Sequence, residues 1–153
     1  MYHKLIENKN FNDDRGIFKI NFGEMNHQFS VKQVNVVHTY HQGTLRGLHF
    51  QYKKPQAKYI SVIQGRIQDV IVDLDTLRYY SFNLDTKYSL YVPKNYAHSY
   101  LVLEPFTVVS YLVDEDYHPE YENGIRWNDP RLNIPWLIDK PNVSERDQSW
   151  GLL

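Results

Sequence analysis

The sequence predicts an all-β domain folded as a jelly roll, and three observations support this fold class. Tyrosine occurs 13 times, whereas alanine occurs only at Ala57 and Ala97. Aromatic residues favour strands and alanine favours helices. Short apolar runs alternate with turn residues up to Val113, and roughly eight such runs in about 100 residues are typical of a jelly roll. After Asp114 the prolines become frequent, which indicates an irregular tail.

Each expected strand lies next to residues that favour turns. The first follows the string NDDRG, Gln64-Gly65 is a strong hairpin signal, and Pro93 ends a later run. In the tail, Ser144 could cap a short helix over residues 144–148. Edge strands of such a barrel favour pairing with another chain, so we expect a homodimer. The expected strands cover residues 18–22, 29–39, 44–51, 58–63, 66–74, 79–84, 88–92, 100–103 and 107–113.

The composition excludes several classes of function. The formal net charge is −1, so no overall positive field would draw nucleic acid or a membrane surface. The lack of cysteine excludes disulfides, thiolate zinc sites and cysteine nucleophiles. A chain of 153 residues suits one domain, residues 1–153. Its start, MYHKLIENKN, lacks the apolar run of a signal peptide, so we expect a cytoplasmic location.

The string RGLHFQ, residues 46–51, is the first candidate for chemistry. Strand alternation places His49 on the same face as Gly47 and Gln51, and a histidine facing into a barrel can accept a proton near neutral pH. Strict alternation puts Arg46 on the other face, so a joint role of Arg46 and His49 requires a bulge. The alternative is a core histidine whose ring nitrogens are satisfied.

The second histidine of interest raises the question of a metal. His98 follows Pro93 at the spacing of the second metal motif of cupins, but His49 lacks the neighbouring histidine that their first motif usually supplies. Three or four ligands are the norm for a transition metal. The sequence therefore predicts no metal site, and a metal-dependent cupin remains an alternative.

Other side chains are candidates with equally ordinary alternatives. Tyr111 could deliver a proton, although most buried tyrosines belong to the core. Asp147 could orient a histidine, and Asp69 and Asp73 share a strand face as polar lining or ion-pair partners. The arginines and Lys58 could contact phosphate or remain surface charges. The chain has no GxSxG, HExxH, GxxxxGK[ST] or GxGxxG string, which disfavours the enzymes that use them.

Longer motifs follow one another along most of the chain. They are DDRGIF, QVNVVHTYHQGTLRGLHFQ, QAKYISVIQGRIQDVIVDL, YVPKNYAHSYLVL, YLVDEDYHPEYENGIRWNDP and VSERD. In this order and at these spacings the chain resembles the sugar-nucleotide 4-keto epimerases, the family of dTDP-4-dehydrorhamnose 3,5-epimerase. The resemblance implies a double-stranded β-helix, a cupin-like barrel that acts as a homodimer.

The resemblance also assigns roles to residues. It implies that His49 abstracts the proton, that Asp147 is its carboxylate partner and that Tyr111 donates the proton. It implies that Tyr117 stacks on the base of a nucleotide-diphosphate sugar, which in this family is usually dTDP-linked. In the family, the arginine that matches Arg15 comes from the neighbouring subunit. The implied substrate contacts are Arg15, Gln33, Asn35, Arg46, Lys58, His98, Glu122 and Arg146.

The chemistry of a 4-keto sugar agrees with these roles. A ketone at C4 acidifies the hydrogens on C3 and C5, so a base and an acid on opposite faces of the ring can invert each centre through an enolate. A cation such as Lys58 would stabilise the enolate oxygen. The reaction requires no cofactor, metal, flavin or nicotinamide. We expect inversion at both C3 and C5; the alternatives are a C3-only epimerase, a 3,4-ketoisomerase and a non-catalytic sugar-binding barrel.

The chain departs from the family pattern at four places. Ser99 stands where glycine usually follows the histidine, and Asp75 opens a different segment, DTLRYYSFNL. Ile20 replaces a glutamate that helps to hold the nucleotide in the family. The segment between DRGIF and QVN is shorter than usual. These departures concern the nucleotide and the sugar, and they leave the proton-transfer residues unchanged.

Overall fold

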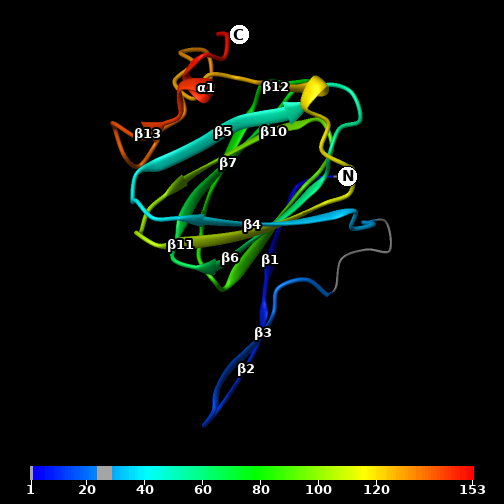
Figure 1. The fold of residues 1–153 in the computed structure, drawn as a ribbon, viewed down its shortest axis with the longest axis vertical. Coiled ribbons are helices and arrows are strands. Elements are labelled where there is room, and N and C mark those ends of the chain that lie inside the picture. The colour runs from blue at the N-terminus through cyan, green and yellow to red at the C-terminus, as the bar shows by residue number, and fades with distance from the viewer. Residues whose placement is uncertain (1, 24–28) are drawn as a thin grey trace.

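The computed structural model describes residues 2–23 and 29–153, and two facing β-sheets make up most of it (Figure 1). One sheet has the strand order β1-β9-β6-β11-β4, and the other has the order β12-β5-β10-β7-β8 with β13 beside β5. Strands β2 and β3 form a separate hairpin that projects from the barrel. The all-β prediction is confirmed, and the sheets form a cupin-like barrel.

Thirteen strands, one 3-10 turn and one short helix make up the regular elements of the described residues. The strands are β1 (Lys4–Glu7), β2 (Lys9–Asp13), β3 (Gly16–Ile20), β4 (Gln33–Thr39), β5 (Thr44–Gln51), β6 (Lys58–Gln64), β7 (Ile67–Asp73), β8 (Tyr79–Leu84), β9 (Tyr88–Val92), β10 (Tyr96–Val102), β11 (Thr107–Val113), β12 (Glu122–Gly124) and β13 (Asn142–Val143). A 3-10 turn, η1 (Pro119–Tyr121), and one short helix, α1 (Glu145–Gln148), complete the described part.

The core has two layers because β7 and β10 are buried on both faces. Ile67 and Ile71 of β7 pack between the sheets, whereas Val70 and Val72 pack on the outer side. There they meet Ile125, Leu132 and neighbouring residues of the C-terminal tail. The irregular tail therefore covers the outer face of the second sheet, and the predicted helix begins after Ser144, whose side chain accepts a hydrogen bond from the Asp147 amide.

Several strand predictions match the structure and others differ. The bounds of β5, β8, β9 and β11 agree with the predicted ranges, and Gln64-Gly65 connects β6 to β7. The prediction missed β1, β2, β12 and β13. The sequence KNFND of β2, for example, has no apolar alternation and is exposed along its whole length. The predicted run 29–39 becomes a strand only at Gln33, and the predicted run 100–103 begins earlier, at Tyr96.

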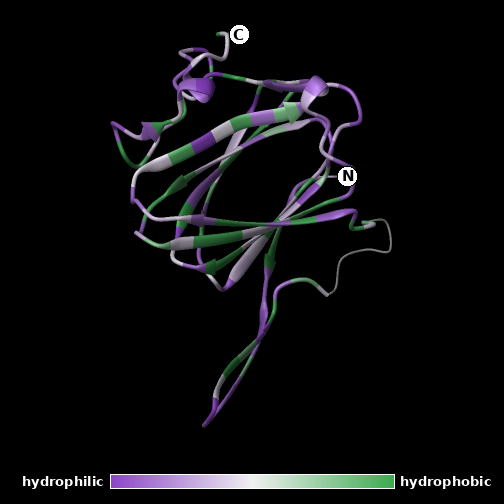
Figure 2. Cartoon of the chain, viewed as in Figure 1, coloured by the Kyte–Doolittle hydropathy of each residue, from purple (hydrophilic) through white to green (hydrophobic). Residues whose placement is uncertain are grey.

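The projecting β2–β3 hairpin exposes apolar side chains. Phe11, Ile17 and Phe18 are 57%, 62% and 67% exposed, and the hairpin carries hydrophobic positions along its length (Figure 2). Val34 and Val36 on the outer face of edge strand β4 are also exposed, at 59% and 56%. No helix in the described residues is long and apolar enough to cross a membrane.

Candidate active site

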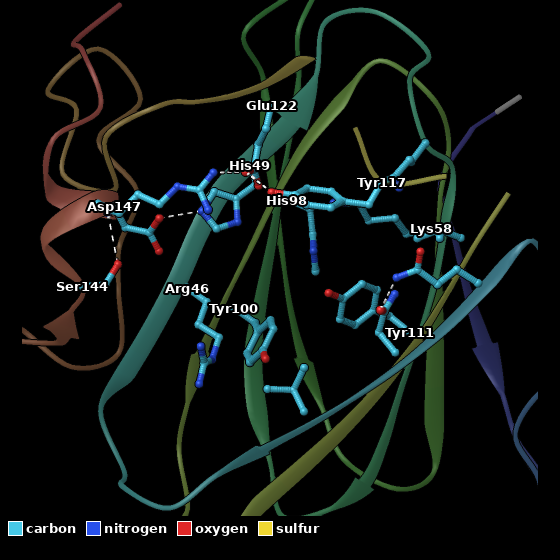
Figure 3. A pocket seen from close by; sticks show the side chains of 16 residues that line it. Arg46, His49, Lys58, His98, Tyr100, Tyr111, Tyr117, Glu122, Ser144 and Asp147 are labelled. Atoms are coloured by element: carbon cyan, nitrogen blue, oxygen red, sulfur yellow. Dashed lines mark hydrogen bonds and ion pairs between the residues drawn. The ribbon is translucent and has the colours of Figure 1, made fainter. Parts of the chain in front are cut away.

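A cavity of about 400 Å³ opens between the two sheets (Figure 3). Strands β4, β6 and β11 supply one wall, β5 and β10 supply the opposite wall, and α1 and β12 lie at the rim. The residues that line it are Gln33, Asn35, Val37, Arg46, His49, Gln56, Lys58, His98, Tyr100, Tyr111, Val113, Tyr117, Glu122, Ser144, Arg146 and Asp147. Polar and titratable side chains from both sheets thus converge on one enclosed space.

A bulge in β5 directs two of these side chains into the cavity. His49 pairs with His98 of β10, and Arg46 pairs with Tyr100, so β5 has one residue more than β10 between the two pairs. Because of the extra residue, the side chains of Arg46 and His49 both point into the cavity, which strict alternation would not allow. This is the bulge that a joint role of the two side chains requires.

Glycine is needed at the bulge. Gly47 has a φ of +117°, and a Cβ atom there would lie 2.5 Å from the backbone oxygen of His98. Strand β10 approaches too closely for any side chain at this position. Gly47 of the RGLHFQ string therefore allows the backbone to form the bulge, and it takes no part in the chemistry itself.

His49 and Asp147 form a hydrogen-bonded pair at the edge of the cavity. His49 Nε2 lies 2.6 Å from Asp147 Oδ1, and the Gly47 amide donates to Asp147 Oδ2 at 3.0 Å. Helix α1 fixes the carboxylate, since the Asp147 amide donates to Ser144 Oγ at 3.1 Å. Because Nε2 is engaged with Asp147, Nδ1 is the ring nitrogen left to face a substrate.

The Asp147 carboxylate is kept ionised by its neighbours. Burial alone raises its pKa, but the hydrogen bond and charge of His49 and the donors from Gly47 and Trp150 outweigh that effect, so its pKa lies below the usual value. An ionised partner stabilises the imidazolium that forms when His49 accepts a proton.

A second histidine–carboxylate pair joins His98, which lines the cavity, to Asp69 in the interior behind it. His98 Nε2 is 2.8 Å from Asp69 Oδ2, and Asp69 is completely buried. The predicted pairing of Asp69 is thus observed as a hydrogen bond with His98, which is an ion pair only when His98 is protonated. Asp73 shares its face, but it accepts hydrogen bonds from the amides of Asp75 and Thr76 and from the Tyr96 hydroxyl.

Lys58 brings a buried amine to the opposite wall. Burial lowers the pKa of Lys58 to about 8, and the negative charge of Asp69 partly offsets this effect. Within residues 2–23 and 29–153, no side chain forms an ion pair with its ammonium group. The ammonium is therefore available for an anionic group that enters the cavity.

Tyr111 lies on the same wall as Lys58, in β11, and its side chain faces the wall that carries His49 (Figure 3). Burial raises the pKa of Tyr111, and the charge of Arg46 opposes this rise. The phenol consequently stays protonated at neutral pH. The imidazole of His49 and the protonated phenol of Tyr111 therefore face each other across one cavity.

The rim of the cavity holds a connected polar group. The Tyr117 hydroxyl donates to Glu122 Oε2 at 2.7 Å, and Arg146 forms an ion pair with the same oxygen. On the other wall, Gln33 Nε2 donates to Asn35 Oδ1 at 2.7 Å. These groups could contact a large polar ligand that extends out of the mouth.

The cavity contains every predicted site residue except Arg15. Arg15 lies in the turn of the β2–β3 hairpin, where it pairs with Asp13. Sequence reasoning missed Tyr100, Val37 and Val113 as lining residues. Each stands two positions from a predicted site residue on the same strand, so strand alternation was the signal that could have identified them. Burial raises the pKa of Tyr100 to about 12.

One further group of side chains could approach a cation. The ligand atoms of Glu115, Asp116 and His118 lie within 4.8 Å of one another. Glu115 is already paired with Lys32 at 2.6 Å, and none of the three lines the cavity. The three side chains therefore lie outside the cavity.

The fold and the site together define a class of protein, the cupin-like barrels whose cavity carries acid–base residues. Comparisons with known proteins narrow the class. The family model described as dTDP-4-dehydrorhamnose 3,5-epimerase matches residues 3–153. The protein of that name from Methanothermobacter thermautotrophicus is 37% identical, and the alignment covers 95% of this chain and 86% of that protein.

Two solved structures agree with this result. The dTDP-4-dehydrorhamnose 3,5-epimerase of Bacillus anthracis, with TDP and PPi bound, has a TM-score of 0.93 and 40% identity, covering 99% of this chain and 94% of that one. The Legionella pneumophila epimerase in complex with dTDP-4-keto-L-rhamnose has a TM-score of 0.92 and 30% identity, covering 98% and 87%. The present chain belongs to the dTDP-4-dehydrorhamnose 3,5-epimerase family.

Proposed function

We propose that this epimerase converts dTDP-4-dehydro-6-deoxy-D-glucose to dTDP-4-dehydro-L-rhamnose by inverting C3 and C5. The observation that carries the proposal is that the His49–Asp147 pair and Tyr111 lie on facing walls of one cavity. The bound ligands named for the Bacillus and Legionella structures support a dTDP-linked substrate. Because sugar nucleotides are usually made in the cytoplasm, we place the reaction there.

In this mechanism His49 is the base. Its Nδ1 accepts the proton from C3 or C5, the electron pair of the broken C–H bond moves into the ring, and the C4 carbonyl becomes an enolate oxygen. Asp147 holds the imidazole through Nε2 and stabilises the imidazolium. The ammonium of Lys58 stabilises the developing negative charge on the oxygen.

Tyr111 completes the inversion. Its hydroxyl gives a proton to the carbon from the face opposite to His49, and the enolate returns to the ketone. The phenolate then takes a proton from solvent, and the His49 imidazolium releases its proton to solvent. The raised pKa of Tyr111 keeps the proton available until a carbanion-like carbon is present. The overall reaction consumes no oxidant, reductant or cofactor.

The remaining site residues are assigned to substrate binding. Tyr117, Glu122 and Arg146 at the rim would hold the nucleotide, with the Tyr117 ring stacked on the base. Gln33, Asn35, Arg46 and His98 would contact the sugar and the diphosphate. This assignment rests on the family resemblance and on the position of these side chains in or around the cavity.

We also propose that the protein is a homodimer in which Arg15 serves the partner's cavity. Its distance from its own cavity and the exposed apolar side chains of the hairpin support this arrangement. Mixing inactive Arg15→Ala with inactive His49→Asn after a brief denaturation tests it. Random pairing would restore about a quarter of the active sites. Failure to recover any activity would contradict a shared site.

Proton exchange in heavy water tests the reaction itself. We expect deuterium at both C3 and C5 of the 4-keto sugar with the wild-type protein and at neither with His49→Asn. Exchange at C3 alone would identify a C3-specific epimerase, and NMR of the product would detect a 3,4-ketoisomerase. If no 4-keto sugar nucleotide showed exchange at either carbon, the proposed function would be wrong.

A further inference from the structure

Trp150 shares the carboxylate oxygen that His49 uses. Its indole Nε1 donates to Asp147 Oδ1 at 3.3 Å, while His49 Nε2 lies 2.6 Å from the same atom. With the Gly47 amide on Oδ2, the carboxylate has three partners, two from β5 and one from the C-terminal segment. Trp150 has been assigned no role beyond its effect on the pKa of Asp147.

The indole is also held firmly against the imidazole. The rings of Trp150 and His49 lie edge to face, with centroids 6.2 Å apart and an interplanar angle of 73°. The guanidinium of Arg146 lies 5.6 Å from the indole centroid. On the opposite side, the indole packs against Gly124 of β12. A Cβ atom on Gly124 would lie 2.4 Å from the indole, so no side chain fits at position 124 while the indole is in place.

The backbone of Trp150 is anchored as well. Arg126 Nε donates to the Trp150 carbonyl at 3.0 Å, and the Arg126 amide donates to the carbonyl of Gly151. These bonds tie the end of the chain to the segment that follows β12. The position of the indole is thus determined by contacts to β5, β12 and α1 rather than by the short C-terminal segment alone.

We infer that Trp150 is a positioning residue for proton abstraction, which prevents rotation of the Asp147 carboxylate and thereby fixes the direction in which His49 presents Nδ1. A carboxylate with one donor on each oxygen can still tilt, and the imidazole that follows it would tilt too. A second donor on Oδ1, joined to a ring packed against the imidazole, removes that freedom. Small errors in the direction of a base are costly for proton transfer.

The inference rests on the proposed role of His49, and the test uses a matched pair of variants. Trp150→Phe keeps an aromatic ring and loses the indole N–H. Trp136→Phe makes the same chemical change in the same tail, where Trp136 Nε1 donates to the Trp127 carbonyl at 2.9 Å, away from the cavity. Both variants lose one indole hydrogen bond, so a general effect on the tail would appear in both.

We expect Trp150→Phe to lower kcat about tenfold with KM changed less than twofold, and to slow deuterium exchange at C3 and C5 by the same factor. Trp136→Phe should leave kcat and exchange unchanged. An unchanged kcat in Trp150→Phe, or an equal loss in both variants, would overturn the inference. A phenyl ring is smaller than an indole, so Trp150→Phe could also lose packing. Benzothienylalanine at position 150 keeps the two-ring shape with sulfur in place of N–H, and it should show the same loss of kcat.

An NMR readout separates this inference from the proposed function. The ring N–H that joins His49 to Asp147 gives a low-field proton signal, identified by its loss in His49→Asn. Its position should change in Trp150→Phe and stay constant in Trp136→Phe, whatever reaction the protein catalyses. A wild-type protein without exchange activity would contradict the proposed function. An unmoved signal in Trp150→Phe would contradict the positioning role.

Discussion

Replacing Lys58 by methionine should make the protein more stable and less active. Lys58 is 9% exposed, and burial lowers its pKa to about 8 from 10.5. Methionine keeps the apolar stem at similar volume and removes the amine. The substitution therefore isolates the free energy of holding a charge in the cavity wall.

The magnitude follows from the two pKa values. At pH 7 the lysine is protonated in both the folded and the unfolded chain, and a difference between 10.5 and about 8 corresponds to about 3 kcal/mol against folding. Lys58→Met should raise the free energy of unfolding by up to that amount. Between pH 8 and 10.5 the unfolded chain binds more protons at this residue than the folded protein does. Wild-type stability relative to the variant therefore rises with pH, and the advantage of the variant shrinks.

Urea unfolding at pH 7, 8 and 9.5 measures this advantage, with exposed Lys87→Met as the matched control. The control should show no comparable gain. The same Lys58 variant should lose about 10²–10³ in kcat if the ammonium stabilises an enolate. Equal stability of Lys58→Met and wild type at all three pH values, or an advantage that grows with pH, would refute the argument.

Three other substitutions have defined outcomes. Tyr111→Phe should retain part of the deuterium exchange while product formation falls about 10²–10⁴-fold, because the base remains and the acid is lost; normal epimerisation would contradict the acid role. Gly47→Ala should lower the free energy of unfolding by more than about 2 kcal/mol in urea, since its Cβ would meet the backbone of β10; wild-type stability would show that β10 can move. Asp69→Asn removes the charge that raises the pKa of Lys58, so the decline of kcat above neutral pH should begin at lower pH; an unshifted pH–rate profile would show that Lys58 does not govern that decline.

Much of the site could be anticipated, because the residue motifs are local in sequence. The family motifs selected His49, Tyr111 and Asp147, and all three line one cavity. The helix cap at Ser144 also follows from a local preference. The pairing of His98 with Asp69 could not be assigned, because β7 and β10 are separated along the chain and only their register brings the two side chains together.

The sequence by itself determined most of the barrel strands, since the β-branched and aromatic residues of β8 and β11 are a property of each segment alone. Only the tertiary structure decided that Arg46 and His49 share a face, because the bulge depends on the close approach of β10 to Gly47. It also decided that Trp150 reaches Asp147 and that burial lowers the pKa of Lys58. The preference for a strand is set by the residues of the segment itself, whereas register, bulges, burial and charge are set by segments that meet only after folding.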